Sequence, residues 1–402
     1  MGYYYYLQSL NIIVNRFYMK VLILGADGYL GWPTSMFFAN KGYKVLAVDN
    51  FFKRKIELEY GISPINEVLT LQSRVKHWNF NQKNKIEYSI GDLLNHRFVY
   101  SIFEKFKPEI IIHYAEQPSA PYSMASRETC YETQQNNVLG NVNILFAIKK
   151  YCPDAHLIKL GTLGEYGTPN IDIEEGWLDL EHNGRKDRVM YPKKPGSFYH
   201  LSKVHDSNNI EFTCRIWGLK ATDLNQGVVY GFHTKETKLD SKLETSFHYD
   251  EIFGTVINRF ITQALAGCDL TVYGNGTQER GYLNIEDTLR CVLLAAENSP
   301  KPSEFRVFNQ FTEKFSINNI AKKIIDALSP KNDDSIKISK VKNPRIEMEN
   351  HYYNPKNSGL ISLGLRPITF SEKLIQDVYN SIKIYKDRID TDLIHPKVKW
   401  KK

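Results

Sequence analysis

The stretch MKVLILGADGYLG, residues 19 to 31, decides the fold expected for this chain. Its apolar run at residues 21 to 24 predicts a strand that is buried on both faces, as strands are in a parallel sheet covered by helices. Gly25, Gly28 and Gly31 follow at a spacing of three, and a helical pattern begins after them. The first glycine permits a tight turn, the second lets a pyrophosphate approach the backbone, and the third lets helix and strand pack closely. This order predicts a doubly wound α/β domain that binds a dinucleotide.

An acidic residue, Asp49, ends the second predicted strand, which covers residues 43 to 48. A carboxylate at this place can accept hydrogen bonds from the ribose hydroxyls of adenosine, and it repels a 2′-phosphate. Asp49 therefore favours NAD over NADP. Lys53 and Arg54, just beyond it, would instead serve the phosphate if the cofactor were NADP.

Length and composition set outer limits on the protein. With 402 residues, the chain can form two domains or one large domain with an elaborated lobe. The formal net charge of +7 comes from basic residues spread along the chain. This distribution favours an anionic small molecule over nucleic acid as a ligand, although solvated surface charge explains it equally well. The five cysteines form no CxxC pair, which indicates a reducing compartment and no metal site. We expect no membrane span, because no apolar run reaches about 18 residues, and we expect residues 1–18 to be a loosely held extension.

A tyrosine and a lysine in SFYHLSK, residues 197 to 203, carry the expected chemistry. Tyr199 and Lys203 are four residues apart, so on a helix they share one face. A phenol, whose usual pKa is about 10, becomes a base near neutral pH only if a cation stabilises its phenolate. Lys203 supplies that cation in this prediction, and Thr162, which follows a predicted strand over 155–160, adds a hydrogen bond to a substrate hydroxyl.

The glycine turn and the Tyr-x-x-x-Lys pair together resemble the extended short-chain dehydrogenases that modify nucleotide sugars. Within that group, the chain is similar to the sulfite-using enzymes of sulfolipid synthesis from about residue 19 to residue 402. The stretches that carry the resemblance are EQPSAPYSM (116–124), KLGTLGEYGTPNIDIEEG (159–176), FYHLSKVHDS (198–207), TDLNQGVVYG (222–231), RVFNQFTE (306–313), NPR (343–345) and HYYN (351–354).

The resemblance implies NAD as cofactor and UDP-glucose and sulfite as substrates. It implies that Tyr199 deprotonates the glucose 4-hydroxyl while hydride passes to NAD. The 4-ketone then acidifies the C5 proton, water leaves from C6, sulfite adds to the alkene, and hydride returns to C4. We expect a Rossmann domain over 19–228, to which 282–315 returns. A smaller mixed α/β lobe, from 229–281 and 316–402, would bind the UDP-sugar.

The chain departs from the pattern of related enzymes near the reacting sugar. In nucleotide-sugar 4,6-dehydratases an Asp-Glu pair follows the threonine, whereas Leu163 and Gly164 stand here. Glu165 and His200 remain as acid and base: Glu165 as base or proton relay, and His200 as the group that polarises the C6 oxygen or guides sulfite. Both also fit structural polar roles. Pro118 replaces a usual arginine, which leaves open how an anion is held, and Ala115 replaces a usual glycine.

The resemblance and the order of motifs predict two sets of contacts. Asp92 would accept from the adenine amino group, and Asn136 and Asn137 are expected to be internal braces or to hold backbone near the site. Arg280 and Arg345 would face the diphosphate. The predicted NAD contacts are Gly25, Asp27, Gly28, Tyr29, Leu30, Gly31, Asp49, Asn50, Lys53, Arg54, Asp92, Leu93, Tyr114, Glu116, Asn137, Tyr199, Lys203, Gln226 and Val229. The predicted UDP-sugar contacts are Gln117, Ser119, Thr162, Tyr199, Gln226, Thr271, Tyr273, Gln278, Arg280 and Arg345.

The same residues are compatible with two other functions. The alternatives are a UDP-glucose 4-epimerase or other nucleotide-sugar dehydratase, and a catalytically silent relative that binds RNA or a protein partner. We expect a homodimer through helices within 119–151 and 197–217. In the helical stretch that ends near residue 151, one apolar face is predicted by the spacing i, i+4, i+7 and i+8 of Val138, Val142, Leu145 and Phe146. Pathway logic places the protein in the plastid stroma, with bacterial cytoplasm as the alternative.

Overall fold

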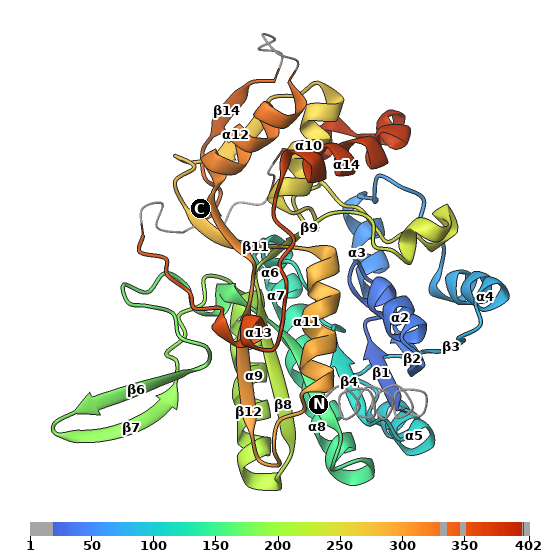
Figure 1. Ribbon diagram of the computed structural model, residues 1–402, viewed down its shortest axis with the longest axis vertical. Coiled ribbons are helices and arrows are strands. Elements are labelled where there is room, and N and C mark those ends of the chain that lie inside the picture. The colour runs from blue at the N-terminus through green and yellow to red at the C-terminus, as the bar shows by residue number, and fades with distance from the viewer. Residues whose placement is uncertain (1–18, 330–335, 346–350, 396, 398–402) are drawn as a thin grey trace, which may run out of the picture.

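The computed structural model describes residues 19–329, 336–345, 351–395 and 397. The predicted extension, residues 1–18, lies outside this range. Among the described residues, seven parallel strands form one sheet in the order β12-β8-β5-β4-β1-β2-β3 (Figure 1). The strands are β1 (Lys20–Leu24), β2 (Lys44–Asp49), β3 (Ile86–Ile90), β4 (Ile110–His113), β5 (His156–Thr162), β8 (Lys220–Gln226) and β12 (Phe305–Gln310). The predicted doubly wound α/β fold is confirmed.

Side chains of β1 alternate between two apolar layers, which explains why the whole strand is buried. Val21 and Ile23 pack in one layer and Leu22 and Leu24 in the other. The first layer is covered by α2 (Gly31–Asn40), α4 (Leu71–Asn81) and α11 (Ile285–Glu297). The second is covered by α5 (His96–Phe106), α8 (Gly140–Tyr151) and α9 (Phe198–Trp217).

The helical stretch before β5 differs from the prediction in its buried face. It consists of α6 (Ala120–Ala125), α7 (Arg127–Gln134), a π-helical segment Gln135–Leu139 and α8. Of the four residues predicted to face the core, only Leu145 is buried, and Phe146 is 46% exposed. The buried side carries Asn137 and Asn141, which donate to Ser202 and Asp206 of α9. The four residues do not share a buried face, because the side that packs against the core and α9 carries Asn137 and Asn141, while Phe146 contacts Trp217 of α9 at the surface.

A second lobe forms from the later part of the chain. It contains two small sheets, with the strand orders β13-β11-β9 and β10-β14. Its apolar core also includes Ile65, which comes from the segment between β2 and β3. The chain leaves the lobe at β11 and returns to the large sheet through α11 and β12 (Figure 1). The bounds are β9 (Val228–Tyr230), β10 (Leu270–Tyr273), β11 (Glu279–Asn284), β13 (Glu313–Ser316), β14 (Ile338–Val341), α10 (Val256–Ala266), α12 (Ile317–Leu328) and α14 (Glu372–Ile382).

The remaining elements lie around these two parts. The hairpin β6 (Trp177–His182) and β7 (Arg185–Met190) projects away from the body (Figure 1). Short 3₁₀ segments cover Leu163–Glu165, Thr237–Leu239, Ser241–Leu243, Lys383–Arg388 and Thr391–Leu393, and the other helices are α3 (Phe52–Tyr60) and α13 (Ser358–Ser362). In the described ranges, no helix has the length and apolar character needed to cross a membrane.

Candidate active site

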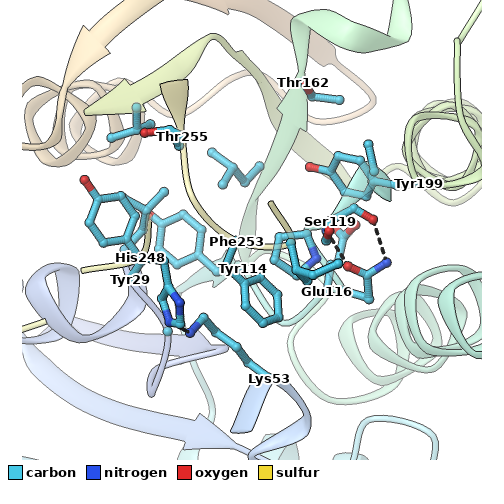
Figure 2. Close-up of a pocket in the computed structure, with 18 of the residues that line it drawn as sticks. Tyr29, Lys53, Tyr114, Glu116, Ser119, Thr162, Tyr199, His248, Phe253 and Thr255 are labelled. Atoms are coloured by element: carbon cyan, nitrogen blue, oxygen red, sulfur yellow. Dashed lines mark hydrogen bonds between the residues drawn. The ribbon is translucent and has the colours of Figure 1, made fainter. Parts of the chain in front are cut away.

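A cavity of about 430 Å³ lies at the carboxyl ends of β1, β2, β4, β5 and β8, where open α/β sheets bind ligands. Residues of the second lobe, among them Tyr273 and Arg280, close its other side. Figure 2 shows side chains from both parts pointing into the same space, with Tyr199 and Thr162 at one end and Lys53 and His248 at the other. One cavity therefore reaches from the predicted dinucleotide site to the predicted sugar site.

The glycine turn has the geometry expected of a pyrophosphate site. Gly25 has φ of +84°, and a Cβ there would lie 2.7 Å from the backbone nitrogen of Ala115. A Cβ on Gly31 would lie 2.0 Å from the Gly25 carbonyl oxygen. Both positions leave no room for a side chain, which explains the two glycines and brings the α2 N-terminus to the cavity.

The end of β2 favours NAD. The Asp49 carboxylate accepts from the backbone N–H of Asp27 at 2.8 Å and of Phe51 at 2.7 Å, and burial raises the pKa of Asp49 to about 6. Arg54 is committed to an ion pair with Asp27, 2.6 Å from its Oδ2, and does not line the cavity. Lys53 lines the cavity but forms an ion pair with Glu57. The two bases that would have served a 2′-phosphate are therefore held by carboxylates.

Tyr199 and Lys203 are on the same face of α9, as predicted. The Lys203 Nζ lies 5.8 Å from the centroid of the Tyr199 ring, donates to the Leu160 carbonyl at 2.6 Å and forms a 2.5 Å ion pair with Glu116. Burial, together with the Glu116 and Glu165 carboxylates, raises the pKa of Tyr199. Lys203 alone therefore does not make the phenol basic here, because Glu116 balances the ammonium charge.

Glu165 lies below the floor of the cavity and not in its lining. Its Oε1 accepts from the Thr162 backbone N–H at 3.1 Å, and its Oε2 is 2.5 Å from the Lys193 Nζ. Burial opposes ionisation, yet the ammonium groups of Lys159 and Lys193 lower the pKa of Glu165 to about 2. This carboxylate stays charged and paired, so the structure favours the structural role over the predicted base.

His200 does line the cavity, beside Tyr199, with their ring centroids 5.1 Å apart. Its Nδ1 is 2.9 Å from the Ser197 hydroxyl. A Cβ on Gly164 would lie 2.3 Å from the His200 Nε2. The imidazole therefore occupies the space that a side chain at residue 164 would need.

Most of the predicted contact residues line the cavity, and six do not. The Asp92 carboxylate accepts hydrogen bonds from the Asn50 side chain and the Leu94 N–H. Asn137 accepts from the Gln117 N–H and donates to the Gln117 carbonyl. Thr271 accepts a hydrogen bond from the Gln263 side chain. Asn137 is thus an internal brace. The six predicted residues outside the lining are Arg54, Asp92, Asn137, Glu165, Lys203 and Thr271.

Arg259 is a cavity residue that the prediction missed. It lies on α10, is only 6% exposed, and has its guanidinium 4.7 Å from the centroid of the Tyr273 ring. A charged residue within the apolar run of Ile257, Phe260 and Ile261 was the available signal. With Arg280 and Arg345, it is one of three arginines in the cavity lining.

Comparisons with known proteins agree with this site. Residues 21–309 match the model of the NAD dependent epimerase/dehydratase family. The chain is 49% identical over 383 residues to the chloroplastic UDP-sulfoquinovose synthase of Spinacia oleracea, with 95% of this chain and 79% of that protein covered. It is 39% identical to the UDP-sulfoquinovose synthase of Sulfolobus acidocaldarius, with 96% and 98% covered. The crystal structure of UDP-glucose 4-epimerase from Thermotoga maritima with UDP-glucose has the same fold, with a TM-score of 0.67, 20% identity, and 92% and 99% coverage. The chain therefore belongs to the NAD-dependent epimerases and dehydratases and, within them, to the UDP-sulfoquinovose synthase family.

Proposed function

We propose that this chain converts UDP-glucose and sulfite to UDP-sulfoquinovose and water, with NAD recycled in each turnover. The observation that carries the proposal is the cavity end formed by Tyr199, Thr162 and His200, with glycine at residue 164. This arrangement retains the oxidoreductase pair but lacks the carboxylates of ordinary dehydratases. It occurs in a chain that is 49% identical to a UDP-sulfoquinovose synthase.

The residues at the glycine turn and strand ends fit NAD. Gly25 and Gly31 allow the close backbone packing that brings the α2 N-terminus to the cavity, and Asp49 suits the ribose hydroxyls. Tyr114 and Glu116 line the cavity together with Tyr199. If bound here, NAD would supply the acceptor for the hydride that leaves C4 of the glucose. Lys203, on the same face of α9, would stabilise the phenolate of Tyr199.

The residues at the sugar end of the cavity then have different roles in the reaction. Tyr199 takes the proton of the 4-hydroxyl, and Thr162 holds that hydroxyl in place. The resulting 4-ketone makes the C5 proton acidic, so that water can leave from C6 and sulfite can add there. Arg259, Arg280 and Arg345 hold the diphosphate, because guanidinium groups match phosphate geometry.

A product assay tests this function. Purified protein incubated with NAD, UDP-glucose and sulfite is expected to yield a sulfonated UDP-sugar, detected by mass spectrometry. Omission of sulfite should abolish that product. If UDP-galactose forms without sulfite, the chain is an epimerase. If UDP-glucose is unchanged while RNA binds and survives Tyr199→Phe, the catalytically silent alternative holds.

We also propose that the protein is a homodimer through α7, α8 and α9. Apolar side chains on these helices and on the π-helical segment between α7 and α8 are exposed, so that a monomer would leave them in water. Tyr131 is 56%, Leu139 52%, Phe146 46%, Phe212 49% and Ile216 54% exposed. Phe146 lies against Trp217 at 4.9 Å between ring centroids, so α8 and α9 share this face. Such a patch marks a protein interface.

The dimer is tested by placing a charge in this face. Phe146→Glu is expected to give a monomer in light scattering. In a symmetric dimer the new carboxylate would be present twice and would be buried without a cationic partner, which is unfavourable. Phe80→Glu is the control, since Phe80 is 88% exposed and lies on α4, which covers the opposite face of the sheet from α8 and α9. A Phe146→Glu protein that remains dimeric would place the interface elsewhere.

We propose the plastid stroma as the compartment, supported by the chloroplastic relative from spinach. Bacterial cytoplasm is the alternative. Fractionation of the source cells decides between them.

A further inference from the structure

The start of α9 joins a serine to the imidazole at the sugar end of the cavity. Ser197 is the N-cap of this helix, and its Oγ accepts from the His200 backbone N–H at 3.2 Å. The same Oγ lies 2.9 Å from the His200 Nδ1. Ser197 is only 7% exposed, so protein atoms satisfy most of its hydrogen bonding.

The hydrogen atoms of this pair can be assigned from its chemistry. A hydroxyl has one proton to donate and lone pairs to accept with. One of these lone pairs accepts from the His200 backbone N–H, and the hydroxyl proton can then be donated to Nδ1 at 2.9 Å. A neutral imidazole that accepts at Nδ1 carries its own proton on Nε2.

The Nε2 atom lies where a neighbouring side chain is missing. A Cβ on Gly164 would be 2.3 Å from it, and His200 lines the cavity with Thr162 and Tyr199. Glycine at residue 164 lets the ring of His200 enter this space, so that the Nε2 side of the ring takes the place of a side chain there.

We propose that Ser197 is a positioning residue that holds His200 with its proton on Nε2, so that the imidazole presents a hydrogen-bond donor to an oxygen of the bound sugar. The identity of that oxygen as part of UDP-glucose rests on the proposed function. The proposed tautomer itself does not, because it concerns only the contact between the Ser197 Oγ and the His200 Nδ1.

Three substitutions separate this role from helix capping. Ser197→Thr keeps the cap and the hydroxyl. Ser197→Asp keeps a cap but can only accept, so it draws the imidazole proton to Nδ1. Ser197→Ala removes both. Ser316→Ala is the matched control, because Ser316 caps α12 through the Asn319 N–H at 3.2 Å and does not hydrogen-bond a histidine in the described part of the chain.

The test combines ¹⁵N NMR of histidine-labelled protein with steady-state kinetics. The His200 signal, identified with His200→Asn, is expected to show a proton on Nε2 in the wild type and in Ser197→Thr, and on Nδ1 in Ser197→Asp. Ser197→Ala and Ser197→Asp should lower kcat by about 10- to 100-fold, part of the roughly 10²–10⁴ that a positioned proton donor contributes. Both should leave the KM for UDP-glucose within about threefold, and Ser316→Ala should change neither quantity.

The results that overturn the proposal differ from those that overturn the function. A wild-type proton on Nδ1 refutes it, and so does a Ser197→Asp protein with unchanged tautomer and unchanged kcat. If the wild type makes no sulfonated sugar, the proposed function fails, and the NMR result still decides the tautomer. If Ser197→Ala loses only thermal stability, as Ser316→Ala does, Ser197 is a cap and nothing more.

Discussion

Tyr199→Phe is expected to lower kcat by about 10³-fold or more, the largest effect of any single substitution considered, because it removes the base that takes the 4-hydroxyl proton. Tyr199 lines the cavity together with Thr162 and His200. The aromatic ring remains and continues to fill its place against His200. Thermal stability and the affinity for NAD and UDP-glucose should therefore stay near their wild-type values.

Stopped-flow absorbance of reduced nicotinamide, followed after mixing with UDP-glucose, measures this loss directly. Tyr191→Phe is the control, because Tyr191 is also buried and its hydroxyl has no hydrogen-bond partner in the described structure. It should keep its activity. If Tyr199→Phe retained more than about a tenth of kcat, another group would be the base and the assignment of Tyr199 would fail.

Glu165→Gln is expected to lower the free energy of unfolding by about 3 kcal/mol, because it leaves the buried Lys193 ammonium without its carboxylate and leaves Lys159 with Asp223 alone. Lys159 and Glu165 are both fully buried and 3.4 Å apart, and Lys193 is 2.5 Å from the second oxygen. The amide oxygen of glutamine can still accept from the Thr162 N–H, so kcat per folded molecule should stay within about tenfold of the wild type. Urea denaturation and active-site-normalised kinetics measure the two effects separately.

Two further variants show whether the loss comes from charge. Glu165→Gln combined with Lys193→Met should recover part of the stability, since the charge left without its partner is then removed. Glu174→Gln, which breaks the partly exposed pair with Lys356, should cost less than about 1 kcal/mol. A stable Glu165→Gln protein with kcat reduced by about 10³-fold would show instead that Glu165 is a catalytic base.

The pH dependence of stability follows from the same group. Because the pKa of Glu165 is lowered from 4.5 to about 2 in the folded state, its contribution is present above pH 4.5. It is lost as the pH falls from 4.5 towards 2. Glu165→Gln should therefore be less stable than the wild type near pH 6, and the difference should shrink in acid.

The sequence by itself determined the features that depend on local spacing. The run of residues 21 to 24, the glycines that follow it and the acidic end of β2 predict strand, turn and helix, because backbone sterics and alternation act over a few residues. Tyr199 and Lys203 share a helix face for the same reason. The resemblance carried by longer stretches then indicated the family, which the relatives confirm.

Only the tertiary structure decided what neighbours each polar group has. Glu165 and His200 were equivalent candidates in the sequence, but the fold buries Glu165 between Lys159 and Lys193 and leaves His200 in the cavity lining. Arg259 reaches the cavity from a helix far along the chain. Charge pairing and burial depend on residues distant in sequence, and a local pattern contains no information about them.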